Sequence, residues 1–492
     1  MKHAPSPAGS RSSSIRRSNT AHSTHSNTHA NMNQSNNTVL AISDDGDRKT
    51  AKALGLAQSE IPDERYLNMV RTKTVGKYNG ISLIFNNMTG IGMIQTSLIF
   101  QQSGWLPVTL FFLLFFVISS LCGLFIVEAM QAIPGNRYFQ GTVEFGTLIN
   151  FYFGPVAHII GQMGLYGALQ LLAVASVIQS SQTMDNLFID LFGRTCGVSL
   201  GISNVTQSAV EWYCVTDHGD SISPFGNVYM LFTGGYLTVA LFVVPMCIFP
   251  LTEFVWVQAV TFTLTLGIFF EWIVSSLVNG LHSDYVPVVG DSSGYAGLVG
   301  VVMLNYAFVQ TIPAWVNVRR PDVNIQESIW MATGSGLGTY LLTGLIPALA
   351  YQIPSNSNLI SVMTSNGGVV SKVFGYLFSM LVLMTSIPVL LVVNQSNLAQ
   401  NFKLHPGITK NKFYVLLNIE SSVISVGLSY FVPWVLAIPF LTGNYLTNIN
   451  VWGSLIFVTS ANFVVPLIIY LKALWFRKAY NERRCNYRLS FN

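Results

Sequence analysis

Short polar side chains and glycines gather inside the first long apolar run of the chain, in the stretch FNNMTGIGMIQ, Phe85–Gln95. The stretch contains five of them: Asn86, Asn87, Thr89, Gly90 and Gly92. Glycine lowers helix stability, and the short side chains of Asn and Thr compete for backbone hydrogen-bond partners. The pattern therefore predicts a local break in a helix. Within a membrane, such a break is tolerated where it faces protein or a water-filled cavity.

A break of this kind would place two opposite partial charges close together. The half-helix that begins near Gly92 would present free N–H groups and a partial positive charge, whereas the carbonyl groups near Asn86–Met88 carry a partial negative charge. This pair suits a zwitterion, whose carboxylate and ammonium groups lie a few ångströms apart. The alternative is structural, because Gly90 and Gly92 could simply let two helices pack closely.

A second interruption lies in the sixth apolar run, in the stretch LNYAFVQTIPAWVN, Leu304–Asn317. Its central polar residues and proline are Asn305, Gln310, Thr311 and Pro313. Proline removes a backbone donor and clashes with the preceding turn, so it kinks or breaks a helix. Interrupted helices five positions apart are what a five-plus-five inverted repeat predicts, with the binding site near the bilayer midplane. The second interruption favours a binding site over close packing.

The composition places both stretches in a membrane. Of the 492 residues, 51% are hydrophobic and 9% are charged, whereas soluble domains contain about 25% charged residues. The mean hydropathy is +0.47. We therefore expect an all-α polytopic membrane protein. Runs of about 20 apolar residues span a bilayer, and they predict about ten helices, at 79–101, 105–130, 155–181, 226–248, 253–278, 295–317, 327–351, 368–393, 413–441 and 450–473.

Basic residues predict the orientation of these helices. With the N-terminus in the cytoplasm, Lys and Arg gather in the inside loops and in the C-terminal segment. An even number of helices puts both ends inside, whereas an eleventh helix, the alternative, would place the basic C-terminal segment outside. We expect a disordered cytoplasmic tail at 1–77, a transmembrane domain at 78–475 and a short basic cytoplasmic tail at 476–492, in the plasma membrane or a vacuolar or lysosomal membrane.

The longest outside loop, 182–225, carries signals of a non-cytoplasmic face. Asn204 begins an Asn-Val-Thr glycosylation acceptor sequence. Cys196 and Cys214 flank it and predict a disulfide, with two free thiols as the alternative. Five cysteines without a CxxC pair, and with no histidine nearby at metal spacing, argue against a zinc or redox site, so no metal or other cofactor is expected. The net charge of +4 reflects the topology, and no nucleic-acid partner is expected.

Acidic residues inside membrane helices are costly and are therefore candidates for function. Glu271 in the fifth predicted helix and Glu420 in the ninth are the candidates for a proton-coupling group. No set of nucleophile, base and acid is evident, so the chain is not expected to be an enzyme.

Four stretches resemble, in the same order, helices of the amino acid/auxin permease family, which belongs to the amino acid–polyamine–organocation superfamily. NNMTGIGMI, followed by SGW, resembles the family's first helix, and YAFVQTIPAW resembles the sixth. LMTSIPVLLVVNQS, Leu383–Ser396, resembles the eighth, and ANFVVPLIIYLKA, Ala461–Ala473, resembles the tenth. The resemblance covers about residues 75–473. The chain departs from the family where Gln310 stands in place of a frequent histidine, and many members have an eleventh helix.

The resemblance implies a leucine-transporter-type fold with a substrate site at the two breaks. The backbone N–H groups at 90–92 would bind the substrate carboxylate, and carbonyl groups near the two asparagines and around Ala307 would meet the ammonium. Phe308 would be an aromatic gate or pocket wall, although packing alone is the competing interpretation. The expected substrate-binding set is Asn86, Asn87, Thr89, Gly90, Ile91, Gly92, Ala307, Phe308 and Gln310.

The resemblance also implies a place for a coupling cation, Na⁺, between the first and eighth helices. Asn86 and Thr385 match the positions concerned, with Ser386 nearby. Hard cations favour oxygen ligands, so the residue types fit. The alternative is that the two hydroxyl groups bond to the backbone of their own helix.

These observations together predict a secondary active transporter, a permease or symporter, that moves amino acids by alternating access. Its coupling ion would be Na⁺ or H⁺, and its partners would be the lipid bilayer and a small-molecule amino acid. Neither break contains a charged residue, so neutral amino acids are expected. The alternative is an amino-acid receptor that transports weakly or not at all and signals through its N-terminal tail.

Overall fold

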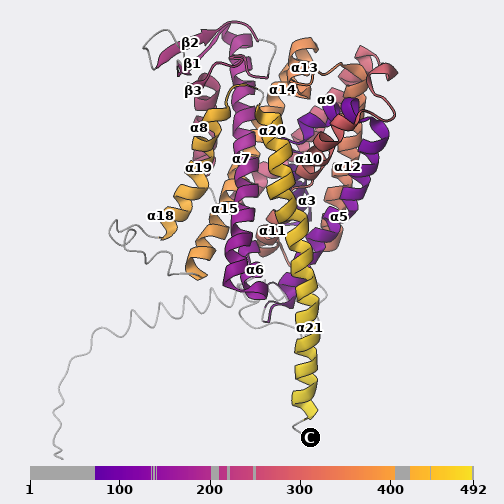
Figure 1. Cartoon of the computed structure of the whole chain (residues 1–492), viewed down its shortest axis with the longest axis vertical. Helices are drawn as coiled ribbons and strands as arrows, with labels where there is room; N and C mark the ends of the chain where they lie inside the picture. The colour runs from indigo at the N-terminus through magenta and orange to yellow at the C-terminus, as the bar shows by residue number, and fades with distance from the viewer. Residues whose placement is uncertain are drawn as a thin grey trace, which may run out of the picture. The chain divides into compact units, whose positions relative to one another are not determined.

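The computed structural model describes residues 73–134, 136, 139, 141–200, 210–218, 222–247, 251–404, 421–443 and 445–489 (Figure 1). The tail expected at 1–77 lies outside this part of the chain, apart from residues 73–77. Glu420 and Asn204 also lie outside it, and so do residues 490–492 of the C-terminal tail.

The described residues include seven helical segments that are long and apolar enough to cross a membrane. They are Trp105–Ala132, Pro155–Phe192, Val255–Asn279, Tyr295–Val318, Val369–Asn401, Val423–Phe440 and Tyr445–Ala479. Three further elements take the first, fourth and seventh places of the predicted order: the interrupted helix at 77–103, α8 (Gly234–Met246) and α12 (Ile325–Ala350). The chain is thus an integral, multi-pass helical membrane protein, and the predicted fold class is confirmed.

The first and sixth spans are interrupted, as predicted. The first consists of α3 (Lys77–Met88), the short 3-10 turn η2 (Met93–Gln95) and α4 (Thr96–Ser103). The sixth consists of α10 (Tyr295–Asn305), the 3-10 turn η5 (Val309–Thr311) and α11 (Ile312–Val318). Pro313 lies in the first turn of α11, where the missing N–H is not needed for an intrahelical bond.

The other spans differ in how regular they are. The second, third and fifth are the continuous helices α5 (Trp105–Ala132), α7 (Pro155–Phe192) and α9 (Leu251–Asn279). The eighth is α14 (Val369–Phe378), a π-helical segment η6 (Ser379–Leu383) and α15 (Met384–Leu404). The ninth is α18 (Ser421–Val426), η7 (Gly427–Phe431), α19 (Val432–Ala437) and η8 (Ile438–Phe440), and the tenth is α20 (Tyr445–Gly453), η9 (Ser454–Val458), η10 (Ser460–Val464) and α21 (Val465–Leu489).

Short helices join the spans. They are α6 (Phe145–Phe153), η3 (Ser283–Tyr285), η4 (Ser292–Gly294) and α13 (Leu359–Asn366). The chain turns sharply from α6 into α7 at Gly154, whose φ of 80° favours glycine, and Pro155 follows in the first turn of α7.

Two predicted helix boundaries that border the loop at 182–225 differ clearly from the structure. The third helix was expected to end at 181, but α7 continues to Phe192, where Gly193 in the left-handed conformation (φ 71°) ends it. The fourth is predicted to begin at 226, but residues 226–229 are a turn and irregular backbone, Met230–Thr233 form a strand, and α8 begins at Gly234. A Cβ atom at Gly235 would clash with the Ser181 carbonyl oxygen, so this glycine lets α8 pack closely on α7.

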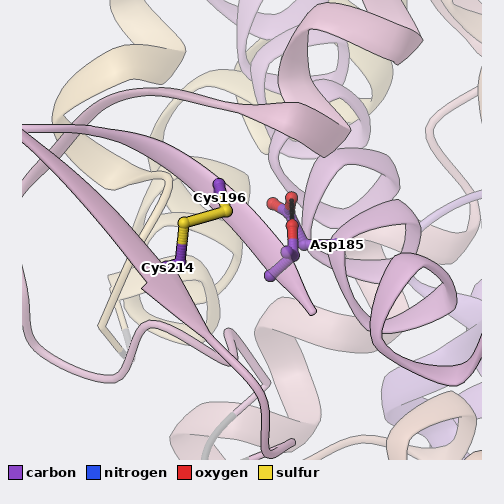
Figure 2. Close-up of a disulfide and its surroundings, with 4 residues drawn as sticks. Asp185, Cys196 and Cys214 are labelled. Atoms are coloured by element: carbon purple, nitrogen blue, oxygen red, sulfur yellow. Dashed lines mark hydrogen bonds between the residues drawn. A yellow bond between two sulfur atoms is a disulfide. The ribbon is translucent and has the colours of Figure 1, made fainter. Parts of the chain in front are cut away.

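The region of the loop predicted to lie outside contains a small antiparallel sheet, in the strand order β2 (Glu211–Val215), β1 (Thr195–Ser199), β3 (Met230–Thr233). Cys196 lies opposite Cys214 in the β1–β2 register and is bonded to it, so the predicted disulfide is confirmed (Figure 2). The Asp185 carboxylate at the end of α7 accepts hydrogen bonds from Thr195 Oγ1 (2.9 Å) and the Gly235 N–H (2.7 Å). These bonds fix the sheet to the helices. Figure 1 shows it at one end of α7, with the end of α21 on the opposite side of the bundle.

Candidate substrate site

The break in the first span leaves backbone donors free. The N–H of Thr89 closes the last turn of α3 on Phe85 O (2.9 Å), and the N–H of Met93 bonds to Gly90 O (3.1 Å). Among the backbone hydrogen bonds of the described residues outside helices and strands, none uses the N–H groups at 90–92. These are the groups that the sequence assigned to a substrate carboxylate, and their availability fits that assignment.

The two glycines of the break have different surroundings. A Cβ atom at Gly90 would meet no other atom within 4 Å, so this residue borders open space. A Cβ atom at Gly92 would lie 2.6 Å from Asn305 Oδ1, so this residue lets the two spans approach closely. Gly90 thus fits the prediction of an open site, whereas Gly92 fits the alternative of close helix packing.

Side chains from each break bond to the other. Asn305 Nδ2 donates to Gly92 O (3.3 Å), and Asn87 Nδ2 donates to Thr311 Oγ1 (3.2 Å). The hydroxyl of Tyr340, on α12, lies within hydrogen-bond distance of Met88 O (2.9 Å) and Asn305 O (2.8 Å). One buried hydroxyl group therefore contacts the carbonyl end of both interrupted helices.

The remaining predicted residues of the sixth break are buried beside the tenth span. The N–H of Gln310 donates to Asn462 Oδ1 (3.1 Å), and its side-chain Nε2 lies 3.5 Å from Ala307 O. Phe308 is fully buried, with its ring edge toward Gly123 on α5. The structure therefore brings the two predicted breaks into contact, with Phe308 buried toward α5 and Gln310 bonded to the tenth span.

The side chain of Gln258, from the fifth span, links two of the predicted cation ligands, Asn86 and Thr385. Asn86 Nδ2 donates to the Gln258 backbone oxygen (2.7 Å) and to Gln258 Oε1 (2.7 Å), and Gln258 Nε2 donates to Thr385 O (3.0 Å). The hydroxyl groups of Thr385 and Ser386 donate to Leu381 O (2.5 Å) and Leu383 O (2.8 Å) of their own span. Among the described residues, no group of three or more His, Cys, Asp or Glu side chains could hold a metal ion.

Glu271 lies on α9, apart from the two breaks, and faces the start of the eighth span. Its Oε1 accepts a hydrogen bond from Ser371 Oγ (2.8 Å), and Ser371 Oγ in turn lies 2.6 Å from Ser275 Oγ. Its second oxygen, Oε2, is buried without a hydrogen-bond partner. A carboxyl group with one unsatisfied oxygen remains a candidate for binding a proton.

A second carboxyl group, which sequence reasoning missed, lies at the opposite end of the bundle from the sheet. Glu144 precedes α6 and is buried, and its Oε1 accepts from Asn317 Nδ2 (3.0 Å) while Oε2 has no partner. Burial raises the pKa of Glu144 to about 7, against the lowering effect of the Asn317 hydrogen bond. Asn317 also bonds to both backbone groups of Val143 (3.2 Å each), so it fastens α11 to this loop.

Nearby basic groups bond to the backbone of the same region. Lys73 Nζ donates to Phe139 O (2.6 Å), and burial together with the positive charge of Arg319 lowers the Lys73 pKa to about 8. The Arg319 guanidinium lies 5.0 Å from the centroid of the Phe139 ring and donates to the Val323 carbonyl oxygen (2.8 Å). The residues before the first span and after the sixth are paired, because Val75 N donates to Val318 O (3.2 Å).

Three residues that complete the site, Gln258, Tyr340 and Asn462, were not in the predicted set. Each is a polar residue within an otherwise apolar or small-residue run, such as VWVQAV around Gln258. That pattern marks a residue of interest in a membrane helix, but the span that it faces is set by the tertiary packing.

Comparisons with known proteins add little to this description. No protein-family model and no curated protein matches the chain. Among solved structures, the chain is similar to a nucleobase-cation-symport-1 family transporter, Mhp1, in a closed conformation with bromovinylhydantoin bound. The sequence identity is 13%, the TM-score is 0.45, and the match covers 83% of this chain and 94% of that one. This score is too low to carry a conclusion, so the fold rests on the helices described above.

Proposed function

We propose that this chain is a secondary active transporter that moves a neutral amino acid across a membrane by alternating access. The observation that carries the proposal is the pair of facing breaks in the first and sixth spans, with free N–H groups at 90–92 on one side. Interrupted helices at matched positions of two repeats are a common way for secondary transporters to hold substrate. The bundle that contains the two breaks would rock against the remaining spans.

The polar groups at the breaks suit the two ends of an α-amino acid. The N–H groups at 90–92 would bind the carboxylate, helped by the partial positive charge at the start of the following half-helix. Asn86 Oδ1 is buried and has no hydrogen-bond partner, so it could accept from the substrate ammonium, together with carbonyl groups near Ala307. Neither Phe85–Gln95 nor Leu304–Asn317 contains a charged residue. A substrate amino acid with a charged side chain would therefore find no opposite charge at the breaks.

We further propose that the chain is a member of the amino acid/auxin permease family, on the four stretches that resemble it. A proton or sodium gradient would drive transport, with Glu271 and Glu420 as the predicted proton-coupling groups. We place the N-terminus in the cytoplasm of a plasma, vacuolar or lysosomal membrane. Asn204, if glycosylated, would then lie on the outer face with the disulfide.

The substitution Gly90→Val tests the site. Because a side chain at Gly90 would enter open space, the variant is expected to fold normally and to fill the substrate site, so uptake of neutral amino acids should be lost. The measurement is uptake per amount of folded protein in proteoliposomes. Gly338→Val is the matched control, since Gly338 is exposed on α12 with no atom within 4 Å of a Cβ position. Uptake at the wild-type rate by folded Gly90→Val protein would refute the site.

A further inference from the structure

One glutamine side chain joins the first span to the eighth through the fifth. Gln258 on α9 accepts from the Asn86 side-chain amide through its backbone oxygen and its side-chain Oε1, and donates from Nε2 to Thr385 O. Gln258 and Asn86 are 1% and 2% exposed, so these bonds form away from water, where an unmade bond is costly. The three bonds form a continuous chain from the break in the first span to the eighth span.

The eighth span is irregular just where this chain of bonds ends. The π-helical segment η6 (Ser379–Leu383) ends immediately before Met384, and Thr385 follows as the second residue of α15. Such segments occur often at functional sites. A helix that is already deformed at the point of contact can change its local geometry when a neighbouring span moves.

The Gln258 amide lies where the sequence suggested a coupling cation. A cation between the first and eighth spans would draw on the oxygens of Asn86 and Thr385, but the Thr385 carbonyl oxygen already accepts from the Gln258 amide. An amide group both donates and accepts, so it can link two spans with no net charge. The link therefore needs neither an ion nor a proton to form.

We propose that Gln258 is a positioning residue that holds the first span against the eighth in this conformation, in place of a coupling cation. The inference rests on the proposed transport function and deepens it, because it implies that sodium does not drive the movement of substrate through this site. When the interrupted first span moves against the eighth, the chain Asn86–Gln258–Thr385 must open at one of its two links. The bonds of Gln258 therefore set how readily the conformation changes.

The test is Gln258→Glu, measured by amino-acid exchange across proteoliposome membranes without an imposed gradient. When the introduced carboxyl group is protonated, it can accept from Asn86 and donate to Thr385 O, as the amide does. When it is ionised it can only accept, so it faces the Thr385 oxygen without a proton between them. Because the link to Thr385 O then no longer has to be broken for the conformation to change, the exchange rate of the variant, divided by that of the wild type, should be about tenfold higher at pH 8 than at pH 5.5, as expected for one lost buried hydrogen bond.

Two comparisons make the result specific. Wild-type exchange should be equal in sodium and in choline buffers. Gln182→Glu is the matched control, because Gln182 is also buried and donates to a backbone oxygen at the end of the ninth span, Leu441 O (3.0 Å), with no hydrogen bond to the first span among the described residues. Its exchange rate per folded protein, relative to the wild type, should not change with pH.

Two results would overturn the proposal: a Gln258→Glu rate ratio that does not vary with pH, or wild-type exchange that requires sodium. If the wild type exchanges no amino acid at all, the proposed function has failed, and thermal unfolding then decides the role of Gln258. Destabilisation of Gln258→Glu relative to the wild type at pH 8 but not at pH 5.5 would support the link. Equal destabilisation at both pH values would overturn it.

Discussion

Tyr340 connects the two breaks with a single hydroxyl group. Its oxygen lies 2.9 Å from Met88 O and 2.8 Å from Asn305 O, the carbonyl groups at the ends of α3 and α10. Its ring stacks on Phe112, with 5.1 Å between the centroids, and packs edge-on against Tyr306. The ring is fully buried, so the hydroxyl is held in place from all sides. Carbonyl groups at a helix end lack intrahelical donors, and the two helix ends share the single O–H donor of Tyr340.

Tyr340→Phe should weaken both the fold and the site. Removing the hydroxyl leaves two buried carbonyl groups without this donor, which costs about 1–3 kcal/mol of unfolding free energy. Because the same carbonyl groups line the breaks, the apparent affinity for substrate should also change. Thermal unfolding and substrate binding measure the two effects.

Tyr236→Phe is the matched control for that substitution. Tyr236 is also buried and donates to a backbone oxygen, Trp434 O (3.0 Å), but it lies on α8 away from the breaks. The Tyr236→Phe substitution should lower the free energy of unfolding without changing the apparent affinity for substrate. If the two variants bind substrate equally well, Tyr340 has only a structural role.

At the scale of secondary-structure elements, α6 and α11 are held together by the Glu144–Asn317 contact. The start of α6 is also bound to two long spans, since Gly146 N donates to Asn397 Oδ1 (3.3 Å) and Gly146 O lies 2.7 Å from His158 Nδ1. The C-terminal half of the sixth span, α11, is therefore fixed to α7 and α15 through α6. Movement of α11 away from these helices would expose Glu144 to water.

The stability of this contact should depend on pH. The Glu144 pKa is raised from its usual 4.5 to about 7, so the folded state binds the proton more tightly than the unfolded state does. The favourable contribution is complete below pH 4.5 and is lost as the pH rises through about 7, a change of roughly 3 kcal/mol. The wild type should therefore lose local stability at α6 and α11 between pH 5.5 and pH 8.

Hydrogen exchange of residues 312–318, corrected for the intrinsic effect of pH on amide exchange, measures this loss. Charged and titratable groups on the surrounding elements are His158 on α7, Arg477, Lys472 and Lys478 on α21, Lys73 before α3 and Arg319 after α11. Glu144→Gln keeps the bond to Asn317 and should remove the pH dependence. Glu128→Gln, which removes an exposed ion pair with Arg477, should leave the pH dependence of hydrogen exchange unchanged. If Glu144→Gln retains the wild-type pH dependence, another of these groups titrates.

Sequence patterns predicted the elements better than their contacts. Runs of apolar residues gave the order of the spans, and Gly and Pro at the two breaks located the interruptions, because these effects are local to the backbone. The end of α7 was missed because its last turns, near Asp185, are polar and contact the sheet. Glu144 and Gln258 were missed for a related reason: what makes each of them distinctive is a partner more than a hundred residues away in the sequence.

At the scale of the whole molecule, the two ends of the bundle are chemically different. One end carries the disulfide-linked sheet, and the other carries α6 and the C-terminal part of α21, whose sequence is rich in Lys and Arg. Disulfides persist in oxidising compartments, and basic segments favour the cytoplasmic side. The proposed substrate site between the first and sixth spans lies within the bundle that separates these two ends, as the proposed transport would require.

The decisive measurement is the accumulation of labelled neutral amino acids in proteoliposomes, with proton and sodium gradients imposed separately. We expect saturable accumulation driven by the proton gradient, no added effect of the sodium gradient, and loss of accumulation in Gly90→Val. Saturable binding that Gly90→Val removes, with no accumulation under either gradient, would contradict transport and indicate a receptor. Neither binding nor accumulation by folded wild-type protein would contradict the assignment of the breaks to amino acids.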